Sequence, residues 1–575
     1  MKKFLTYCFL FIAAPAFSQY YLRGEIKDEK NKPLANARIF VHSLRAYYYS
    51  GSPSGSFGIV EKVLYDSLTI NLEGYESLTV RVKTNDWQHI ILKITKEAIT
   101  KNQPKLISFT KDFQQASKDK WFTGDETYFQ LVENEVIQAS QFPCTGFSLN
   151  VNKASYSNVR RFLNMNSLVP PDAVRTEELI NYFNLHYREP QHDSLFNFNS
   201  QLTSCPWDPK KELLYLNVNA KKINLEKIPP GNFVFLIDVS GSMDMPNRLP
   251  LLKAAFQMFV KNIRPVDTIS IVTYGGYVQI WLRPTSGSEK DKILTAIESL
   301  EADGDTPGES AIRVAYQLAR KTFIKGGNNR IILATDGDFN VGETSEKALD
   351  DLISKQKSSG VYLTCLGVGM GNLKDSKLQV LAKKGNGNYA YLDDIQEAER
   401  VLVKELTQTF YAVADDVSMN VKFNPDLVKE YRLIGFDNKK EALKDTANSL
   451  EGGEIGSGSS VLALFEIVPN FNINHGSNDF IAQIDLRYRT DSTIKHHQYF
   501  SMPNYKPIDS IDREFKFAAG VAMFALKLKQ SIFFSSPSWS FIKEFSTAAI
   551  DQKNYLQKQF IMLLSKAQKL YGNKK

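Results

Sequence analysis

The feature that most constrains the fold is a regular alternation of apolar runs and amphipathic stretches between residues 231 and 410. Runs of strand length, such as FVFLI at 233–237 and VYLTCLGVG at 361–369, show no period-two alternation. Between such runs lie stretches with apolar residues at helical spacing, such as LPLLKAAFQMFVKNI at 249–263. Continuous apolar strands separated by helices are typical of a mostly parallel sheet covered on both faces. The sequence therefore predicts a doubly wound (Rossmann-like) α/β domain over residues 231–410.

Two of the predicted strands run into an aspartate, Asp238 or Asp336. Ser240 and Ser242 directly follow the first, and Thr306 lies in a Gly- and Asp-rich loop before a predicted helix. Doubly wound sheets bind ligands at the carboxyl ends of their strands, where the strand order reverses. Two carboxylates and three hydroxyls converging there would suit a hard cation such as Mg²⁺, with Mn²⁺ or Ca²⁺ as alternatives. Taken singly, each aspartate could instead cap a helix and each serine could serve a turn.

This combination resembles the metal-ion-dependent adhesion site of von Willebrand factor A-type (VWA) domains. The likeness is carried by D-x-S-x-S at 238–242, the later threonine, and T-D-G at 335–337. It implies that Ser240 and Ser242 bind the ion directly, that Thr306 exchanges with water, and that Asp238 and Asp336 act directly or through water. It also implies a non-enzymatic protein that binds a protein partner, with an acidic side chain of the partner completing the coordination of the metal.

The flanking regions resemble bacterial exported VWA proteins as well. ASYSNVRRFL and PPDAVRTEELINYF match a companion region, which we place at 141–230. ATDGDFNVG, GMGNLKDSKL and KGNGNYAYLDD carry the same likeness inside the α/β domain. We expect a β-rich region over 411–512 and a helical region over 513–575. The chain departs from the family pattern at Asn150 and Asn152, where aspartates are frequent, and at Asp305, which precedes Thr306.

The first 18 residues have the pattern of a secretory signal peptide. Two lysines precede an apolar stretch, and small residues follow at the positions that a signal peptidase reads. The apolar run is too short to span a bilayer without tilt or thinning, so we expect no membrane span after cleavage. The sequence therefore predicts export to the periplasm, to the outer membrane or into the medium.

Residues 19–94 alternate short period-two strands with turn residues and predict a small antiparallel β-sandwich. This stretch resembles a carboxypeptidase regulatory-like domain, with the likeness carried by Gly24, Asp28, Pro33, Leu34, Ala37, Phe57, Gly74 and Tyr75. Residues 95–140 are polar and weakly periodic, and are predicted to be a linker with little core of its own.

Composition and local motifs bear on the other function classes. The net charge is +7 and the basic residues are not gathered into one stripe, which does not support nucleic-acid binding. GVGMGN at 367–372 lacks the third glycine of a dinucleotide-binding loop, and the seven histidines show no close metal-ligand spacing. A Ser/His/Asp hydrolase leaves no local signature, so it stays a less favoured alternative. The stronger alternative is a structural or assembly component of the cell envelope, in which the metal only fixes loops.

Three cysteines follow the predicted signal peptide: Cys144, Cys205 and Cys365. Cys365 lies in a run that reads as a buried strand. In an oxidising compartment, either Cys144 and Cys205 form a disulfide or all three are free thiols.

Overall fold

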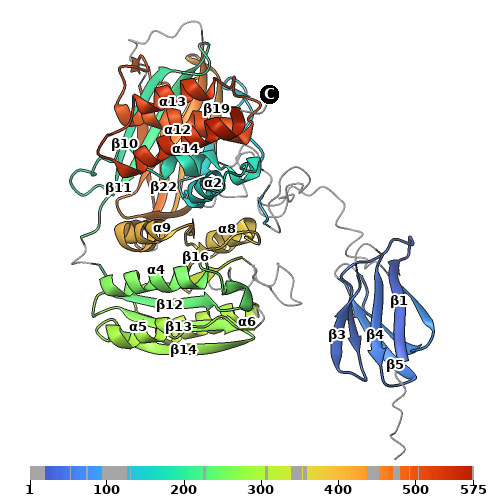
Figure 1. Ribbon diagram of the computed structural model, residues 1–575. Coiled ribbons are helices and arrows are strands. Elements are labelled where there is room, and N and C mark those ends of the chain that lie inside the picture. Colours follow the sequence, from blue (N-terminus) through green and yellow to red (C-terminus); the bar gives the residue numbers. More distant parts are fainter. Residues whose placement is uncertain are drawn as a thin grey trace, which may run out of the picture. The chain divides into compact units, whose positions relative to one another are not determined.

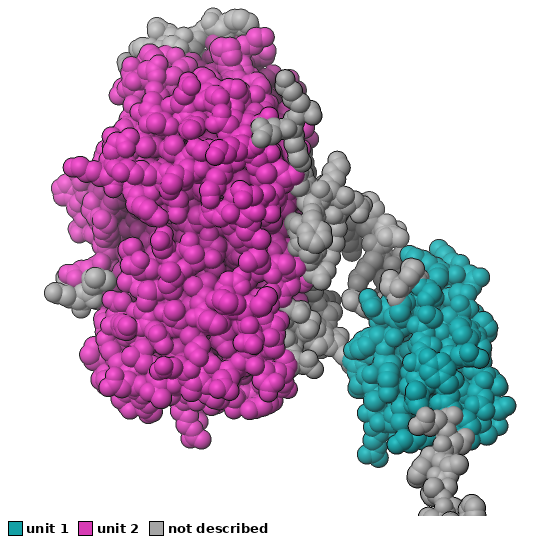
Figure 2. Space-filling view, viewed as in Figure 1, with its two compact units in different colours: residues 1–111 teal, residues 112–575 magenta. Residues whose placement is uncertain are grey.

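The computed structural model forms two compact units, residues 1–111 and 112–575 (Figure 2). It describes residues 20–51, 54–72, 75–93, 126–129, 131–224, 228–304, 308–337, 353, 359–436, 452–470, 479–490, 493–502 and 504–572. The predicted signal peptide, Gly74, Asp305 and Thr306 lie outside these residues. Within the described ranges, no helix is long and apolar enough to cross a membrane.

The first unit contains two β-sheets that enclose a small apolar core. Its strands are β1 (Tyr20–Asp28), β2 (Arg38–Val41), β3 (Ala46–Tyr49), β4 (Ser56–Glu61), β5 (Tyr65–Asn71), β6 (Leu78–Lys83) and β7 (Trp87–Leu92). The sheet orders are β4-β1-β7 and β3-β2-β5-β6. Alternate residues such as Leu22, Ile39 and Leu68 fill the core. The expectation of a wholly antiparallel sandwich is wrong at one pair, because β7 returns to the free edge of β1 in the same direction.

The α/β domain has a single six-stranded sheet, as its apolar runs predicted. The strands are β12 (Gly231–Asp238), β13 (Thr268–Gly275), β14 (Tyr277–Ser286), β15 (Asn328–Thr335), β16 (Val361–Gly367) and β17 (Tyr389–Tyr391). Their order is β14-β13-β12-β15-β16-β17, and every neighbouring pair is parallel except β13 with β14. The strand order reverses at β12, which confirms the doubly wound fold class.

Helices cover both faces of this sheet (Figure 1). The helical elements are α4 (Leu249–Asn262), α5 (Lys290–Glu298), α6 (Gly308–Lys321), α8 (Asp375–Lys384), α9 (Ile395–Glu399), the π-helical turn η5 (Arg400–Lys404) and α10 (Leu406–Phe410). Successive side chains of β12 point to opposite faces and contribute to the apolar core on each. Phe235 stacks on Phe256 of α4 on one face, and Leu236 packs with Ala315 of α6 on the other. Burial on both faces explains why these strands read as continuous apolar runs.

The described parts of 126–224 and 411–572 form a second body, which we call the platform. Its strands are β8 (Ile137–Gln138), β9 (Cys144–Ser148), β10 (Phe196–Ser204), β11 (Glu212–Ala220), β18 (Ala412–Phe423), β19 (Val428–Ile434), β20 (Gly453–Gly456), β21 (Ser460–Pro469), β22 (Ala482–Thr490), β23 (Thr493–Ser501) and β24 (Tyr505–Lys506). Its helices are α2 (Ala154–Asn164), the 3₁₀ turn η2 (Pro171–Ala173), α3 (Thr176–Asn181), α12 (Arg513–Lys529), α13 (Trp539–Thr547) and α14 (Tyr555–Gly572). These elements form three layers: helices, a sheet of order β24-β10-β11-β21-β19-β8, and a second sheet that contains β18.

The platform is built from chain segments on both sides of the α/β domain. Strand β11, which precedes that domain, pairs with β21, which follows it, with Leu214 opposite Phe465. Tyr215 faces the helical core, whereas Leu214 faces the core between the two sheets. The α/β domain is therefore an insertion into the platform. Both of its ends contact one residue, because Asn328 donates from its backbone to Pro230 O (2.9 Å) and from its side chain to Phe410 O (2.7 Å).

One further expectation needs correction, and one open alternative is decided. Residues 126–129 and 131–140 were expected to have little core, yet Tyr128 is buried in the helical core and β8 extends the first platform sheet. Cys144 and Cys205 are free thiols, as is Cys365. Cys144 lies on β9, which pairs with β18, whereas Cys205 belongs to the helical core, so the two occupy different layers.

The junction between the α/β domain and the platform contains buried ion pairs. Arg160 of α2 donates to Asp393 (2.8 Å) and to Glu397 (2.9 Å) of the α/β domain. Arg175 donates to Asp375 (2.7 Å), at the start of α8. Arg330 of β15 donates to Glu454 of β20 (2.7 Å). Arginine supplies several donors to each carboxylate, which compensates the buried charges and fixes the domain on the platform.

Candidate metal centre

The carboxyl ends of β12 and β15 lie side by side at the point where the strand order reverses. Ile237 and Ala334 are partners in the parallel register, so Asp238 and Asp336 leave the sheet next to each other. Both aspartates are fully buried. The sequence argument from strand ends is confirmed for this pair of positions.

Asp238 is held by hydroxyl and amide donors. Its Oδ1 accepts from Ser240 N (3.0 Å) and Ser240 Oγ (2.7 Å), and its Oδ2 accepts from Thr335 Oγ1 (2.8 Å). Burial raises the pKa of Asp238 to about 6, although the hydrogen bonds from Ser240 and Thr335 oppose this shift. An ionised carboxylate at such a buried position is stabilised by any cation brought beside it.

Ser242 continues this chain of oxygens to the second aspartate. The short turn η4 (Gly241–Met243) places Ser242 Oγ 3.2 Å from Ser240 Oγ and 2.8 Å from Asp336 Oδ2. Met243 anchors the turn, since its side chain is buried in the core beneath. Neighbouring ligands around an octahedral Mg²⁺ with bonds of about 2.1 Å lie about 3.0 Å apart. The donor chemistry and the spacing of these four residues therefore fit a small hard cation.

The loop that carries Thr306 approaches the same edge. Thr306 itself lies outside the described residues, but Gly304 O accepts from Gly241 N (3.0 Å) within the serine turn. Gly304 has φ +79°, and a Cβ there would lie 2.6 Å from Gly276 N. Only glycine fits such a close approach of two backbones. Four of the five predicted residues are thus brought together, and the described end of the third loop lies beside them.

Two residues that the sequence reasoning missed complete this edge. Arg248, just before α4, lies 2.9 Å from Asp336 Oδ2 through Nη1 and donates through Nη2 to Met370 O (3.0 Å). Asn372 donates to the same Asp336 oxygen (2.8 Å) and accepts from Arg248 (2.8 Å). Asn372 could have been predicted from the sequence, because it is a polar residue soon after the strand at 361–367, whose carboxyl end lies at the same edge of the sheet. No sequence pattern indicated Arg248, since its long side chain reaches the site from the turn before α4.

The loop that contains Asn372 also contacts the platform. Gly371 N donates to Glu126 Oε1 (2.7 Å), and Glu126 forms a paired contact with Arg161 of α2 (2.6 and 2.8 Å). Thr127 N donates to Leu373 O (2.9 Å). The carboxyl edge is thus continuous with the platform through a few polar contacts.

Three family models match the chain in succession. They are "von Willebrand factor" over residues 122–215, "von Willebrand factor type A domain" over 232–409, and "Uncharacterized protein YfbK, C-terminal" over 408–570. The uncharacterized protein YfbK of Escherichia coli (strain K12) is 38% identical over 476 residues, which are 77% of this chain and 81% of that protein. The chain belongs to the YfbK family of VWA-domain proteins.

Other similarities cover smaller parts or are weaker. The magnesium-chelatase 67 kDa subunit of Chlorobaculum parvum is 27% identical over 191 residues, 30% of this chain and 30% of that protein. A solved structure, "von Willebrand factor type A from Catenulispora acidiphila", matches with a TM-score of 0.39 and 13% sequence identity. The match covers 65% of this chain and 91% of that structure's chain. Because the type A family model covers residues 232–409, the α/β domain is the VWA domain of this YfbK-family chain.

Proposed function

We propose that this chain is an exported, non-enzymatic protein that binds a protein partner through a divalent cation. The cation is held by Asp238, Ser240, Ser242, Thr306 and Asp336. The observation that supports this most is the unbroken chain of side-chain oxygens from Asp238 to Asp336, at spacings of 2.7, 3.2 and 2.8 Å. The assignment as a binder rather than an enzyme rests on membership of a VWA-domain family.

The residues divide into different roles. Ser240 and Ser242 offer hydroxyl oxygens directly, and Asp238 orients Ser240 while supplying negative charge. Asp336 Oδ2 already accepts from three donors, Ser242, Asn372 and Arg248, so it acts through a water molecule. When bound, Mg²⁺ supplies a positive charge and an open coordination position for an outside carboxylate.

The metal site is tested by titrating Mg²⁺ into the purified chain and measuring the heat of binding. We expect Asp238→Ala to weaken Mg²⁺ binding at least about a hundredfold, beyond the roughly 10–100-fold cost of losing a supporting residue. Asp244→Ala is the matched control, since Asp244 is an exposed acid on the same loop. Equal Mg²⁺ affinity in Asp238→Ala and wild type would refute the site.

The partner chemistry is tested with paired peptide arrays in which each Asp or Glu has an Asn or Gln counterpart. Capture should require both the carboxylate and Mg²⁺, and should disappear in EDTA. Capture that persists in EDTA would overturn cation-mediated gripping and favour the structural alternative. Export is tested separately, because the mature chain recovered from its source cells should begin near Gln19.

A further inference from the structure

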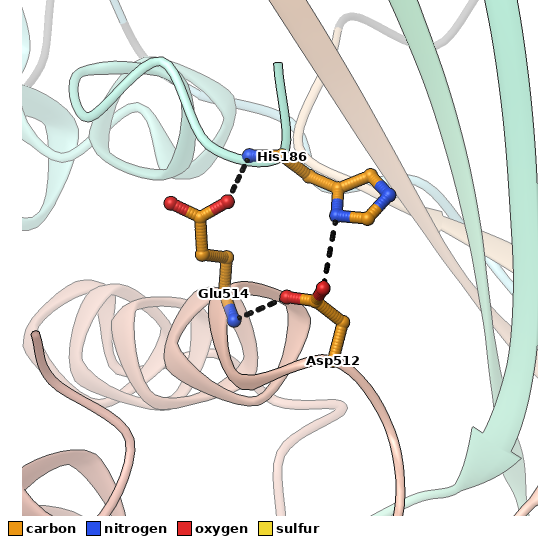
Figure 3. A group of neighbouring side chains, drawn as sticks. All are labelled: His186, Asp512 and Glu514. Carbon is orange, nitrogen blue, oxygen red and sulfur yellow. Dashed lines mark hydrogen bonds and ion pairs between the residues drawn. The ribbon is translucent and has the colours of Figure 1, made fainter. Parts of the chain in front are cut away.

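A second cluster of metal-ligating side chains lies within the platform, away from the VWA domain. The turn after α3 brings His186 to the start of α12, where Asp512 and Glu514 lie (Figure 3). One potential ligand atom from each residue lies within 4.8 Å of the other two. His186 and Glu514 are 328 residues apart in the chain, so no sequence spacing could reveal the group.

Backbone groups fix the orientation of both carboxylates. Asp512 is the N-cap of α12, and its Oδ1 accepts from Glu514 N (2.8 Å). Glu514 Oε2 in turn accepts from His186 N (2.8 Å). Each carboxylate therefore uses one oxygen to hold the backbone and keeps the other for a further ligand. Supporting hydrogen bonds of this kind orient the ligands in protein metal sites.

The buried ring nitrogen of His186 is a separate indication that a ligand binds here. The residue is only 9% exposed, and its ring lies against Phe515 with centroids 4.1 Å apart. Its Nδ1 is buried and makes no hydrogen bond, although it faces Asp512 Oδ2 at 3.5 Å (Figure 3). That separation is long for a hydrogen bond. It matches the roughly 3.4 Å expected between two ligands of one tetrahedral ion with bonds of about 2.1 Å.

The competing explanation is an ion pair that joins the turn to the helix. Arg188 already supplies positive charge to Asp512, with Nη2 3.7 Å from Oδ2, and its side chain is 59% exposed. An exposed pair of this kind contributes little to stability and can separate at little cost. Asp512 therefore has a cation beside it without His186, and the 3.5 Å separation between His186 Nδ1 and Asp512 Oδ2 is long for a direct hydrogen bond.

We propose that His186, Asp512 and Glu514 bind a transition-metal ion such as Zn²⁺, with water as the fourth ligand. Two carboxylates neutralise a divalent ion, and an imidazole nitrogen favours Zn²⁺ over Mg²⁺ or Ca²⁺. The ion fastens the turn after α3 to the start of α12, beside Leu185 and Phe515 of the helical core. This site differs in chemistry from the all-oxygen set of the VWA domain, so the two select different metals.

The test uses the full chain, stripped with EDTA and then held in excess Mg²⁺ to occupy the oxygen site. Zn²⁺ is titrated against a chromophoric chelator, and Co²⁺ absorption reports a nitrogen-containing site. Three variants keep the structural role and remove a ligand. His186→Phe keeps a ring against Phe515, Asp512→Asn keeps a capping side chain, and Glu514→Gln keeps an acceptor for His186 N.

We expect one equivalent of Zn²⁺ in wild type and at least about tenfold weaker binding in each variant. His192→Phe, an exposed histidine on the same segment, should bind Zn²⁺ as wild type does. Asp238→Ala should lose Mg²⁺ and keep Zn²⁺, which separates the two sites. Absence of Zn²⁺ binding by wild type would overturn the proposal. So would wild-type affinity in both Asp512→Asn and Glu514→Gln, even if His186→Phe failed to fold.

Discussion

The VWA domain and the platform bury similar apolar layers but are assembled in opposite ways. The VWA sheet is built from βα units that follow one another along the chain. The platform sheet instead joins β11 to β21 across the whole inserted domain. A local pattern of apolar residues is sufficient to predict the first, because each unit packs against its neighbours in sequence. The second depends on pairing between distant segments, for which the sequence carries no local signal.

The two regions also treat buried charge differently. At the junction with the platform, carboxylates face arginines, as in Arg160 with Asp393 and Glu397. At the carboxyl edge of the VWA sheet, the donors to Asp238 are hydroxyl and amide groups. The junction carries its own compensating cations, whereas the buried charge of Asp238 at the carboxyl edge is suited to a cation from solution.

The largest effect should come from breaking the junction. Burial raises the pKa of Glu397, but Arg400 and Arg160 outweigh this and lower it to about 2, so Glu397 is ionised at neutral pH. Arg160→Met leaves the buried carboxylate of Asp393 without its arginine partner and should cost about 3–5 kcal/mol of unfolding free energy in urea titrations. Lys404→Met, which removes an exposed pair with Glu399, should cost less than about 1 kcal/mol. A similar small loss in both variants would show that the junction does not hold the domain.

A smaller effect is expected inside the platform sheet. Burial raises the pKa of Glu212 to about 7 from its ordinary value of 4.5. The unfolded chain therefore ionises Glu212 more easily, and wild-type stability falls as pH rises from about 4.5 through 7. Glu212→Gln should gain about 1 kcal/mol relative to wild type above pH 7 and nothing near pH 4, after allowance for solvent screening. Urea midpoints measured across this range check it, and a gain that is independent of pH would contradict it.

The smallest effect concerns Arg248, the cationic side chain beside Asp336 at the carboxyl edge. Arg248 lies 2.9 Å from Asp336 and so places positive charge beside the proposed ion. Arg248→Gln should tighten Mg²⁺ binding about threefold, roughly 0.6 kcal/mol, because this repulsion is removed. Arg264→Gln is the control, since Arg264 pairs with Asp267 at the start of β13, near the opposite edge. Weaker Mg²⁺ binding in Arg248→Gln would mean that the arginine supports the loops more than it repels the ion.

The sequence predicted residues whose placement follows from local order. Asp238 and Asp336 end neighbouring parallel strands, so the topology alone brings them together. Arg248 and the Glu126–Arg161 pair escaped prediction because long side chains connect segments that are distant in sequence. His186 escaped for the same reason, since its partners lie at the far end of the chain. The sequence left open whether Cys144 and Cys205 form a disulfide, because a count of cysteines cannot show which layer each cysteine occupies.

The contacts of Asn328 with Pro230 and Phe410 have a consequence for how this family can diversify. The chain enters and leaves the inserted domain at neighbouring positions, since both ends contact Asn328. Recombination can therefore exchange the whole domain without separating β11 from β21. Selection can then alter the carboxyl edge while the platform beneath keeps its hydrogen-bond register. New specificities would arise in such lineages without the scaffold having to evolve again.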